Sequence, residues 1–187
     1  MRLPELPSGF ALVAVDGCGG SGKTTLAERF AAGAGGTVVH GDDFYRPMPA
    51  AERVALTPEQ GYDRYFDWQR LRDEVLAPLR AGTGARYRKY DWGTGEVGGE
   101  VHEIAPSGLV VVEGCYTARP ELADCYDLTV FVDTSRAVCL ERQRARGHDH
   151  GPEDWIGRWR AAEEHYLRTT DPAGRLTVTV SGEPDQG

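Results

Sequence analysis

Five short apolar runs along the chain have the length and composition of buried β-strands. They lie at residues 10–15, 37–40, 109–112, 128–132 and 175–180. The run at 109–112 is Leu-Val-Val-Val, which is typical of a central parallel strand covered on both faces. The pattern therefore predicts a sheet of about five strands.

The segments between these runs carry other patterns. Residues 68–81 have apolar side chains at positions 68, 71, 75, 76 and 79, as on one face of a helix, with Pro78 disturbing the last turn. We expect further helices at 24–32, 136–146 and 152–168, an antiparallel hairpin of residues 85–92 and 96–104, and irregular structure at 41–60. Because strands alternate with helices, we predict a three-layer α/β fold with a mostly parallel sheet, formed by residues 1–187 as one domain.

The length, composition and net charge of the chain limit the class of protein. A chain of 187 residues with 40% hydrophobic and 27% charged residues fits one soluble globular domain. Its 21 basic and 29 acidic residues give a formal charge of −8, which argues against a nucleic-acid partner, because phosphate backbones require clustered Lys and Arg. We see no signal peptide or membrane span, so we expect no membrane partner and a cytoplasmic location. A homo-oligomer is left open.

The cysteines do not form a recognisable metal site. Cys18, Cys115, Cys125 and Cys139 contain no CxxC pair, and no His lies at zinc-finger spacing from them. We expect them to be small buried hydrophobes in a reducing compartment.

The segment after the first predicted strand matches the phosphate-binding pattern G-x-x-x-x-G-K-[ST]. A loop that surrounds a phosphate must point several backbone N–H groups inward, and glycine allows the dihedral angles that this requires. Lys23 should reach the β- and γ-phosphates of a nucleotide, and the Thr24 hydroxyl should coordinate Mg²⁺. The expected contacts to bound ATP are Gly17, Gly19, Gly20, Ser21, Gly22, Lys23, Thr24 and Thr25.

Two acidic positions follow strands that should end beside this loop. Asp42 comes directly after the second strand, where ligands of open α/β sheets bind, and can accept a proton from an attacking hydroxyl. Glu113 ends the apolar run at 109–112 and suits a position near Mg²⁺. Each acid could instead be a turn or strand-end residue.

An Arg-rich stretch lies between the last two predicted helices. Arg142, Arg144 and Arg146, followed by His148 and Asp149, could form a mobile lid over the triphosphate. The alternative is a solvated basic face of a helix.

Taken together, these segments resemble the uridine kinase and phosphoribulokinase branch of the P-loop kinases. The matching segments occur in the family's order, at residues 16–25, 42–46, 66–67, 90–91, 113–114, 131–134 and 146–149. Nicotinamide riboside kinases look similar at Asp42-Asp-Phe. The resemblance implies a P-loop fold with strand order 2-3-1-4-5, a small hairpin on the acceptor side and an Arg-bearing lid.

The resemblance also implies roles for individual residues. Asp42 would be the catalytic base for a ribose 5′-hydroxyl, and Asp67 would accept hydrogen bonds from the 2′- and 3′-hydroxyls. Lys23 would act on the transferring phosphoryl group. The remaining roles fall to the nucleoside-pocket residues Tyr45, Phe66 and Tyr90, the metal-site residues Thr24 and Glu113, and the lid cations Arg142 and Arg146.

One position departs from the family and leaves the acceptor open. Uridine kinases carry a pyrimidine-reading His three residues after the aromatic that follows Tyr-Asp, and Gly95 occupies that place here. The expected activity is an ATP-dependent kinase for a nucleoside. The alternatives are nicotinamide riboside, a pantothenate-like or other hydroxylated acceptor, or a nucleotide-binding switch or assembly factor without an acceptor.

The tryptophans have two readings. Trp92 could stack on a planar base, because aromatic faces stack on any base. Trp155 and Trp159 are one helical turn apart, which favours packing in the core or the lid.

Overall fold

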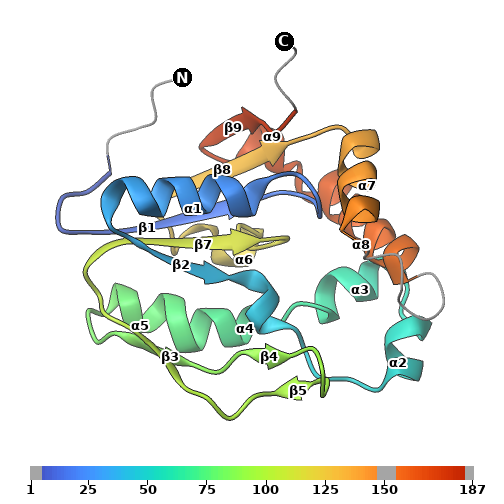
Figure 1. Ribbon diagram of the computed structural model, residues 1–187, viewed down its shortest axis with the longest axis horizontal. Helices are drawn as coiled ribbons and strands as arrows, with labels where there is room; N and C mark the ends of the chain where they lie inside the picture. Colours follow the sequence, from blue (N-terminus) through green and yellow to red (C-terminus); the bar gives the residue numbers. More distant parts are fainter. Residues whose placement is uncertain (1–5, 147–154, 184–187) are drawn as a thin grey trace.

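The structure is a computed structural model that describes residues 6–146 and 155–183. It confirms the α/β fold, with five parallel strands in one sheet and helices on both faces (Figure 1). The strands of this sheet are β1 (Phe10–Asp16), β2 (Thr37–His40), β7 (Gly108–Gly114), β8 (Leu128–Asp133) and β9 (Val178–Ser181).

The order of strands across the sheet is β2-β7-β1-β8-β9. The expected order 2-3-1-4-5 numbered only the five parallel strands, whereas the labels of Figure 1 also count four short strands between β2 and β7. The two sets of numbers differ for that reason, and each parallel strand has the expected neighbours. β9 pairs with β8 and completes the sheet at one edge.

The predicted hairpin forms in two separate pieces. β3 (Ala85–Tyr87) pairs with β6 (His102–Ile104), and β4 (Tyr90–Asp91) pairs with β5 (Glu96–Val97), both antiparallel.

Helices cover the sheet and extend beyond the carboxyl ends of its strands. In Figure 1, α1 lies on one side of the sheet and α4 and α5 on the other, while α2, α3, α7 and α8 gather where the strands end. Their bounds are α1 (Lys23–Ala34), α2 (Ala50–Ala55), α3 (Pro58–Arg64), α4 (Trp68–Leu71), α5 (Ala77–Arg80), α6 (Pro120–Ala123), α7 (Arg136–Ala145), α8 (Trp155–Thr170) and α9 (Pro172–Arg175).

The prediction of irregular structure at residues 41–60 was wrong. A 3₁₀ turn (Gly41–Phe44), α2 and the start of α3 occupy this segment. α3 begins with a capping box, in which Thr57 and Gln60 each accept the other's backbone N–H, and Pro58 occupies the first helical position.

Two other boundaries differ from the prediction. The helix expected at 68–81 contains a π turn (Arg72–Leu76) between α4 and α5, where Ala77 N–H bonds to the carbonyl five residues back. The wide turn directly precedes Pro78, which has no N–H to continue an α-helical ladder. Arg175 ends α9 instead of beginning the last strand, because Asp171 caps a short helix that starts with Pro172.

The core has two parts, one on each face of the sheet, because successive strand residues point to opposite faces. Ala11, Val13 and Val15 of β1 pack with α1 in one part. Leu12 and Ala14 pack in the other, larger part, which also holds the aromatic residues of α3 and α8. Within the described ranges, no helix combines the length and apolarity needed to cross a bilayer.

Candidate active site

The loop between β1 and α1, called the cradle below, has a backbone conformation that requires glycine. Gly20 and Gly22 have φ angles of +85° and +99°, a region that side-chain-bearing residues rarely adopt. A Cβ on Gly20 would also overlap the backbone carbonyl of Cys139 in α7. The Ser21 N–H bonds to Cys18 O at 3.0 Å and closes the turn, so the backbone conformation of the loop depends on glycine at these points.

A cavity of about 470 Å³ lies next to the cradle, where the strands end. It brings together residues from the loop, from the segment after β2, from β7 and from the helical end of the molecule. Nine of the predicted site residues line it: Gly19, Gly20, Lys23, Thr24, Asp42, Tyr45, Trp92, Glu113 and Arg146.

Lys23 and Asp42 share this cavity and have linked charges. Burial disfavours the ammonium of Lys23, but the neighbouring groups Cys115, Glu113 and Asp42 outweigh this effect, so the pKa of Lys23 is raised. The Asp42 side chain is open to solvent inside the cavity while protein surrounds it on most sides. The surrounding protein removes water from around the carboxylate and so raises the pKa of Asp42, and the charge of Lys23 opposes the rise. The carboxylate is therefore more basic than an ordinary Asp.

A hydroxyl and a carboxylate meet at the start of α1. Thr24 Oγ1 donates to Glu113 Oε2 at 3.2 Å, and His40 Nδ1 lies 2.7 Å from Glu113 Oε1. Burial opposes the charge of Glu113, but the His40 hydrogen bond and Lys23 keep the pKa of Glu113 below its usual value. Two hard oxygen ligands side by side fit Mg²⁺, which keeps several water or phosphate ligands of its own. In the described part of the chain, no group of three His, Cys, Asp or Glu residues could hold a metal.

Three predicted substrate residues are not among the described residues that line the cavity: Phe66, Asp67 and Tyr90. Phe66 is buried and forms a single β-bridge with Tyr45. Asp67 caps α4 by accepting the Arg70 N–H at 3.3 Å, and its Oδ1 lies 3.2 Å from Arg46 Nη2.

Tyr90 lies behind Trp92, with ring centroids 5.0 Å apart, and its hydroxyl accepts from Arg53 at 3.0 Å. The cavity wall on this side is therefore made by Tyr45 and Trp92, with Tyr90 behind them.

The two expected lid cations lie in different places. Arg142 Nη1 donates to the carbonyls of Gly20 and Ser21 at 3.2 and 3.3 Å, and its Nη2 donates to Gly182 O at 2.9 Å. These contacts fix the back of the cradle, whereas Arg146 faces the cavity. His148 and Asp149, the rest of the expected lid, lie outside the described residues.

Five cavity residues were not among the predicted site residues: Cys115, Gln143, Trp155, Ile156 and Trp159. Trp159 is 9% exposed and stacks on Tyr45 at 5.4 Å between centroids, so it packs in the core, as its spacing indicated, and forms cavity wall as well. No motif in the sequence indicates that these residues lie beside the cradle, because they come from segments far from it in the chain.

Glu163 links α8 to the cradle through a single oxygen. Its Oε1 accepts from Gly19 N–H at 2.7 Å, from Trp159 Nε1 at 2.8 Å and from the Cys115 thiol at 3.3 Å. The carboxylate is buried and lines a second, smaller cavity on the other side of Gly19, of about 250 Å³. A charged group at this depth is stabilised by the three donors that converge on it.

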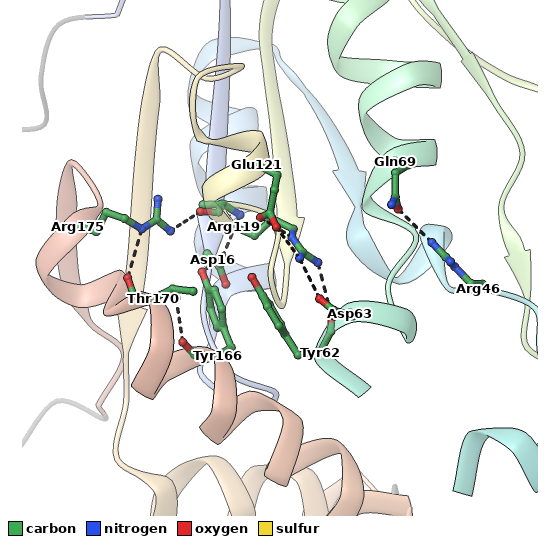
Figure 2. A network of polar contacts seen from close by, with 11 residues as sticks. Asp16, Arg46, Tyr62, Asp63, Gln69, Arg119, Glu121, Tyr166, Thr170 and Arg175 are labelled. Atoms are coloured by element: carbon green, nitrogen blue, oxygen red, sulfur yellow. Dashed lines mark hydrogen bonds and ion pairs between the residues drawn. The ribbon is translucent and has the colours of Figure 1, made fainter. Parts of the chain in front are cut away.

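Asp16 directly precedes the loop, and Figure 2 shows it beside Tyr166 of α8. Its two oxygens accept from Gly17 N–H at 2.6 Å, Ala118 N–H at 2.9 Å, Tyr116 N–H at 3.1 Å and the Tyr166 hydroxyl at 2.8 Å. Complete burial raises the pKa of Asp16 above its usual value, and the hydrogen bonds from Tyr166, Ala118 and Gly17 reduce this rise. The carboxylate thus joins β1, the segment after β7 and α8 directly beneath the cradle.

Comparisons with known proteins identify the family of the chain. The family model described as "Phosphoribulokinase / Uridine kinase family" matches residues 12–172. A uridine kinase of Deinococcus deserti is 29% identical over 140 residues, which are 72% of this chain and 67% of that protein.

Solved structures with the same fold include two bacterial proteins. A protein of Bacillus stearothermophilus described as a possible uridine kinase has a TM-score of 0.72 at 23% identity, over 92% of this chain and 89% of that one. A candidate kinase of a fructose transport system, from Silicibacter sp. TM1040, has a TM-score of 0.68 at 25% identity, over 95% of this chain and 93% of that one.

Proposed function

Because the chain belongs to the phosphoribulokinase and uridine kinase family, we propose that it transfers the γ-phosphoryl group of ATP to a hydroxyl of a small molecule. The observation that carries this proposal is the shared cavity of Lys23 and Asp42, with a phosphate cradle on one side and space for an acceptor on the other. A nucleoside with a free 5′-hydroxyl is the first candidate acceptor.

The residues of the chain have separate tasks in this reaction. The cradle N–H groups and Lys23 hold the phosphates and neutralise the transferring group. Asp42 orients the acceptor hydroxyl in line with the phosphorus and takes its proton, for which its raised pKa is suited. Arg146 adds a cation from the helical side of the cavity.

Thr24 and Glu113 would hold Mg²⁺, since their oxygens lie side by side at the start of α1. The metal supplies charge neutralisation at the β- and γ-phosphates when it is bound. The hydrogen bond between His40 and Glu113 lowers the pKa of this carboxylate and fixes its direction.

The aromatic wall supports an acceptor with a flat ring. Tyr45, Trp92, Trp155 and Trp159 all line the cavity, and aromatic faces stack on any planar base. Asp67 does not line this cavity, and its contacts with Arg46 and the N-terminus of α4 both use Oδ1. Ribose recognition through Asp67 would therefore use its other oxygen, Oδ2.

The test is ADP release from ATP–Mg²⁺ in the presence of a panel of nucleosides, nicotinamide riboside and pantothenate-like alcohols. We expect one acceptor class to stimulate ADP release and to yield a phosphorylated product. Lys23→Ala should abolish turnover, while Asp42→Asn should retain ATP binding and lose transfer by about 100-fold or more.

A stimulated rate in Asp42→Asn equal to that of the wild type would disprove the assignment of the base. Slow hydrolysis that no acceptor stimulates would indicate a nucleotide-binding switch or assembly factor instead of a kinase.

A further inference from the structure

We infer that Gln143 is a catalytic residue of the transfer, with its amide N–H donating to the transferring phosphoryl group and its carbonyl holding Arg146. The inference rests on the proposed function, because it concerns the same cavity. Nothing in the local sequence marks this residue, which lies on α7 one position after Arg142.

Gln143 is buried although one of its polar atoms makes no hydrogen bond to the described residues. Gln143 is only 7% exposed, yet its Oε1 has no hydrogen-bond partner in the described part of the molecule. A buried carbonyl without a partner costs about 1–3 kcal/mol. Gln143 also lines both the central cavity and the smaller cavity behind Gly19. The buried oxygen therefore needs a hydrogen-bond donor, which a residue that lines the central cavity can supply.

The NH₂ end of the amide faces the cradle. A Cβ on Gly19 would overlap Gln143 Nε2, and Glu163 Oε1 would lie 3.3 Å from that same point. A carboxylate nearby favours the donor end of the amide over its oxygen on this side. Because Gly19 lines the central cavity together with Lys23, an N–H at this point faces the place where the γ-phosphoryl group would lie.

The carbonyl end has a natural partner one helical turn away. Gln143 and Arg146 are three residues apart, so they share one side of the end of α7, and both line the central cavity. A guanidinium carries five donors and can give one to Gln143 Oε1 while others face a phosphate. The amide then satisfies its buried oxygen and fixes the direction of a flexible cation at the same time.

The chemical step itself is unchanged by this role. The acceptor oxygen forms a bond to the γ-phosphorus, the bond from that phosphorus to the β–γ bridging oxygen breaks, ADP leaves, and the hydroxyl proton passes to Asp42. Gln143 neither gains nor loses a proton. Its N–H stabilises negative charge on a non-bridging γ-oxygen, as donors of oxyanion holes do.

The experiment compares Gln143→Met, which keeps the length of the side chain without its polar atoms, and Gln143→Glu, which replaces the NH₂ with a second oxygen. With the best acceptor, we expect Gln143→Met to lower kcat by about 100-fold, since one such donor contributes about 10² to 10³ in rate. Gln143→Glu should be slower still, because a carboxylate would face the phosphoryl group. The dissociation constant of ADP, measured by calorimetry, should change by no more than about threefold, because ADP lacks the γ-phosphoryl group.

Glu141→Gln is the matched control, since Glu141 is exposed on the same helix and contacts neither cavity. It should retain wild-type kcat. A purely structural role of Gln143 predicts a different result, with ADP affinity and melting temperature falling together with kcat. That result, or a kcat for Gln143→Met within about threefold of the wild type, would overturn the inference.

A second measurement separates this inference from the proposed function. ADP–Mg²⁺ with aluminium fluoride mimics a phosphoryl group in flight and needs no acceptor. Gln143→Met should bind this complex at least about tenfold more weakly than the wild type, after correction for ADP alone. If no alcohol is phosphorylated by the wild type, the proposed acceptor chemistry fails. The aluminium fluoride comparison still decides whether Gln143 contacts the phosphoryl group, and equal affinities would reject that contact.

Discussion

Replacing Asp16 with asparagine should destabilise the protein strongly, although the two side chains have nearly the same shape. Asp16 is completely buried, and four hydrogen-bond donors converge on its two oxygens. Three of these donors are backbone N–H groups, of Gly17, Tyr116 and Ala118, which cannot reverse their polarity. The fourth is the Tyr166 hydroxyl, which can rotate.

The magnitude follows from counting the donors that asparagine can still satisfy. The Asn oxygen can replace Oδ1 and serve Gly17 and Tyr116. The new NH₂ group then meets the Tyr166 hydroxyl, which can turn and accept, and the Ala118 N–H, which cannot. One buried N–H without a partner and the loss of charge-assisted bonds together cost about 2–4 kcal/mol. That is a large part of the 5–15 kcal/mol that stabilises a typical domain, so the variant should be near its folding threshold.

The measurement is urea unfolding followed by tryptophan fluorescence near pH 7.5. Tyr166→Phe is the matched variant, because it removes the one donor that can rotate and leaves the carboxylate with three backbone partners. It should cost about 1–2 kcal/mol, less than Asp16→Asn. If Asp16→Asn costs less than Tyr166→Phe, the polarity of the backbone donors is not what holds the carboxylate, and the reasoning is refuted.

Two further predictions concern other parts of the chain. Gly33→Ala should raise the free energy of unfolding by about 0.5–1 kcal/mol, because a Cβ there meets open space within α1. Gly20→Ala should lower it by more than about 2 kcal/mol and abolish nucleotide binding, because Gly20 has a positive φ and a Cβ there would overlap the Cys139 carbonyl. Thermal unfolding and calorimetry check both variants, and equal effects would contradict the cradle geometry. The buried Arg119 guanidinium holds the pKa of Glu121 below its usual 4.5, so this pair stabilises the fold above that pH and stops doing so as the pH falls through the lowered pKa. The difference in unfolding free energy between wild type and Glu121→Gln should therefore be constant at neutral pH and vanish in acid, and a difference that grows in acid would contradict it.

The sheet could be predicted from the sequence because its strands are buried on both faces. The run at residues 109–112 is rich in valine, has the length of a strand and is followed by Gly114, which together favour a buried strand over a helix. The short helices were harder. α2 and α3 lie among Pro47, Pro49 and Pro58, and their signal is the pairing of Thr57 with Gln60, which has to be weighed against the breaking effect of proline.

Site residues were predictable where a strand end determines their position. Lys23, Thr24, Asp42 and Glu113 share one cavity because parallel strands end at the same edge of the sheet. Asp67 differs, because its Oδ1 already accepts from Arg46 and from the first turn of α4. These contacts are visible only in three dimensions.

Gln143 of α7 and the residues that come from α8 could not be predicted to face the cradle. Gln143, Trp159 and Glu163 lie more than 100 positions after it in the sequence, and no motif marks them. Their place depends on how two helices pack beyond the end of the sheet, which neither the apolar period nor a turn signal specifies.

The bracing of the cradle has a consequence for the protein while it is being made. The Ser21 carbonyl accepts from Thr134 and Arg142, which lie 113 and 121 positions later, and Gly19 donates to Glu163, which lies 144 positions later. A ribosome therefore releases the phosphate-binding motif long before the groups that shape it. A nascent chain that has emerged only as far as β8 carries the complete motif but lacks the partners that hold its peptide groups in place. The loop could therefore bind a nucleotide only after α8 has left the exit tunnel, so unfinished chains would not sequester nucleotide.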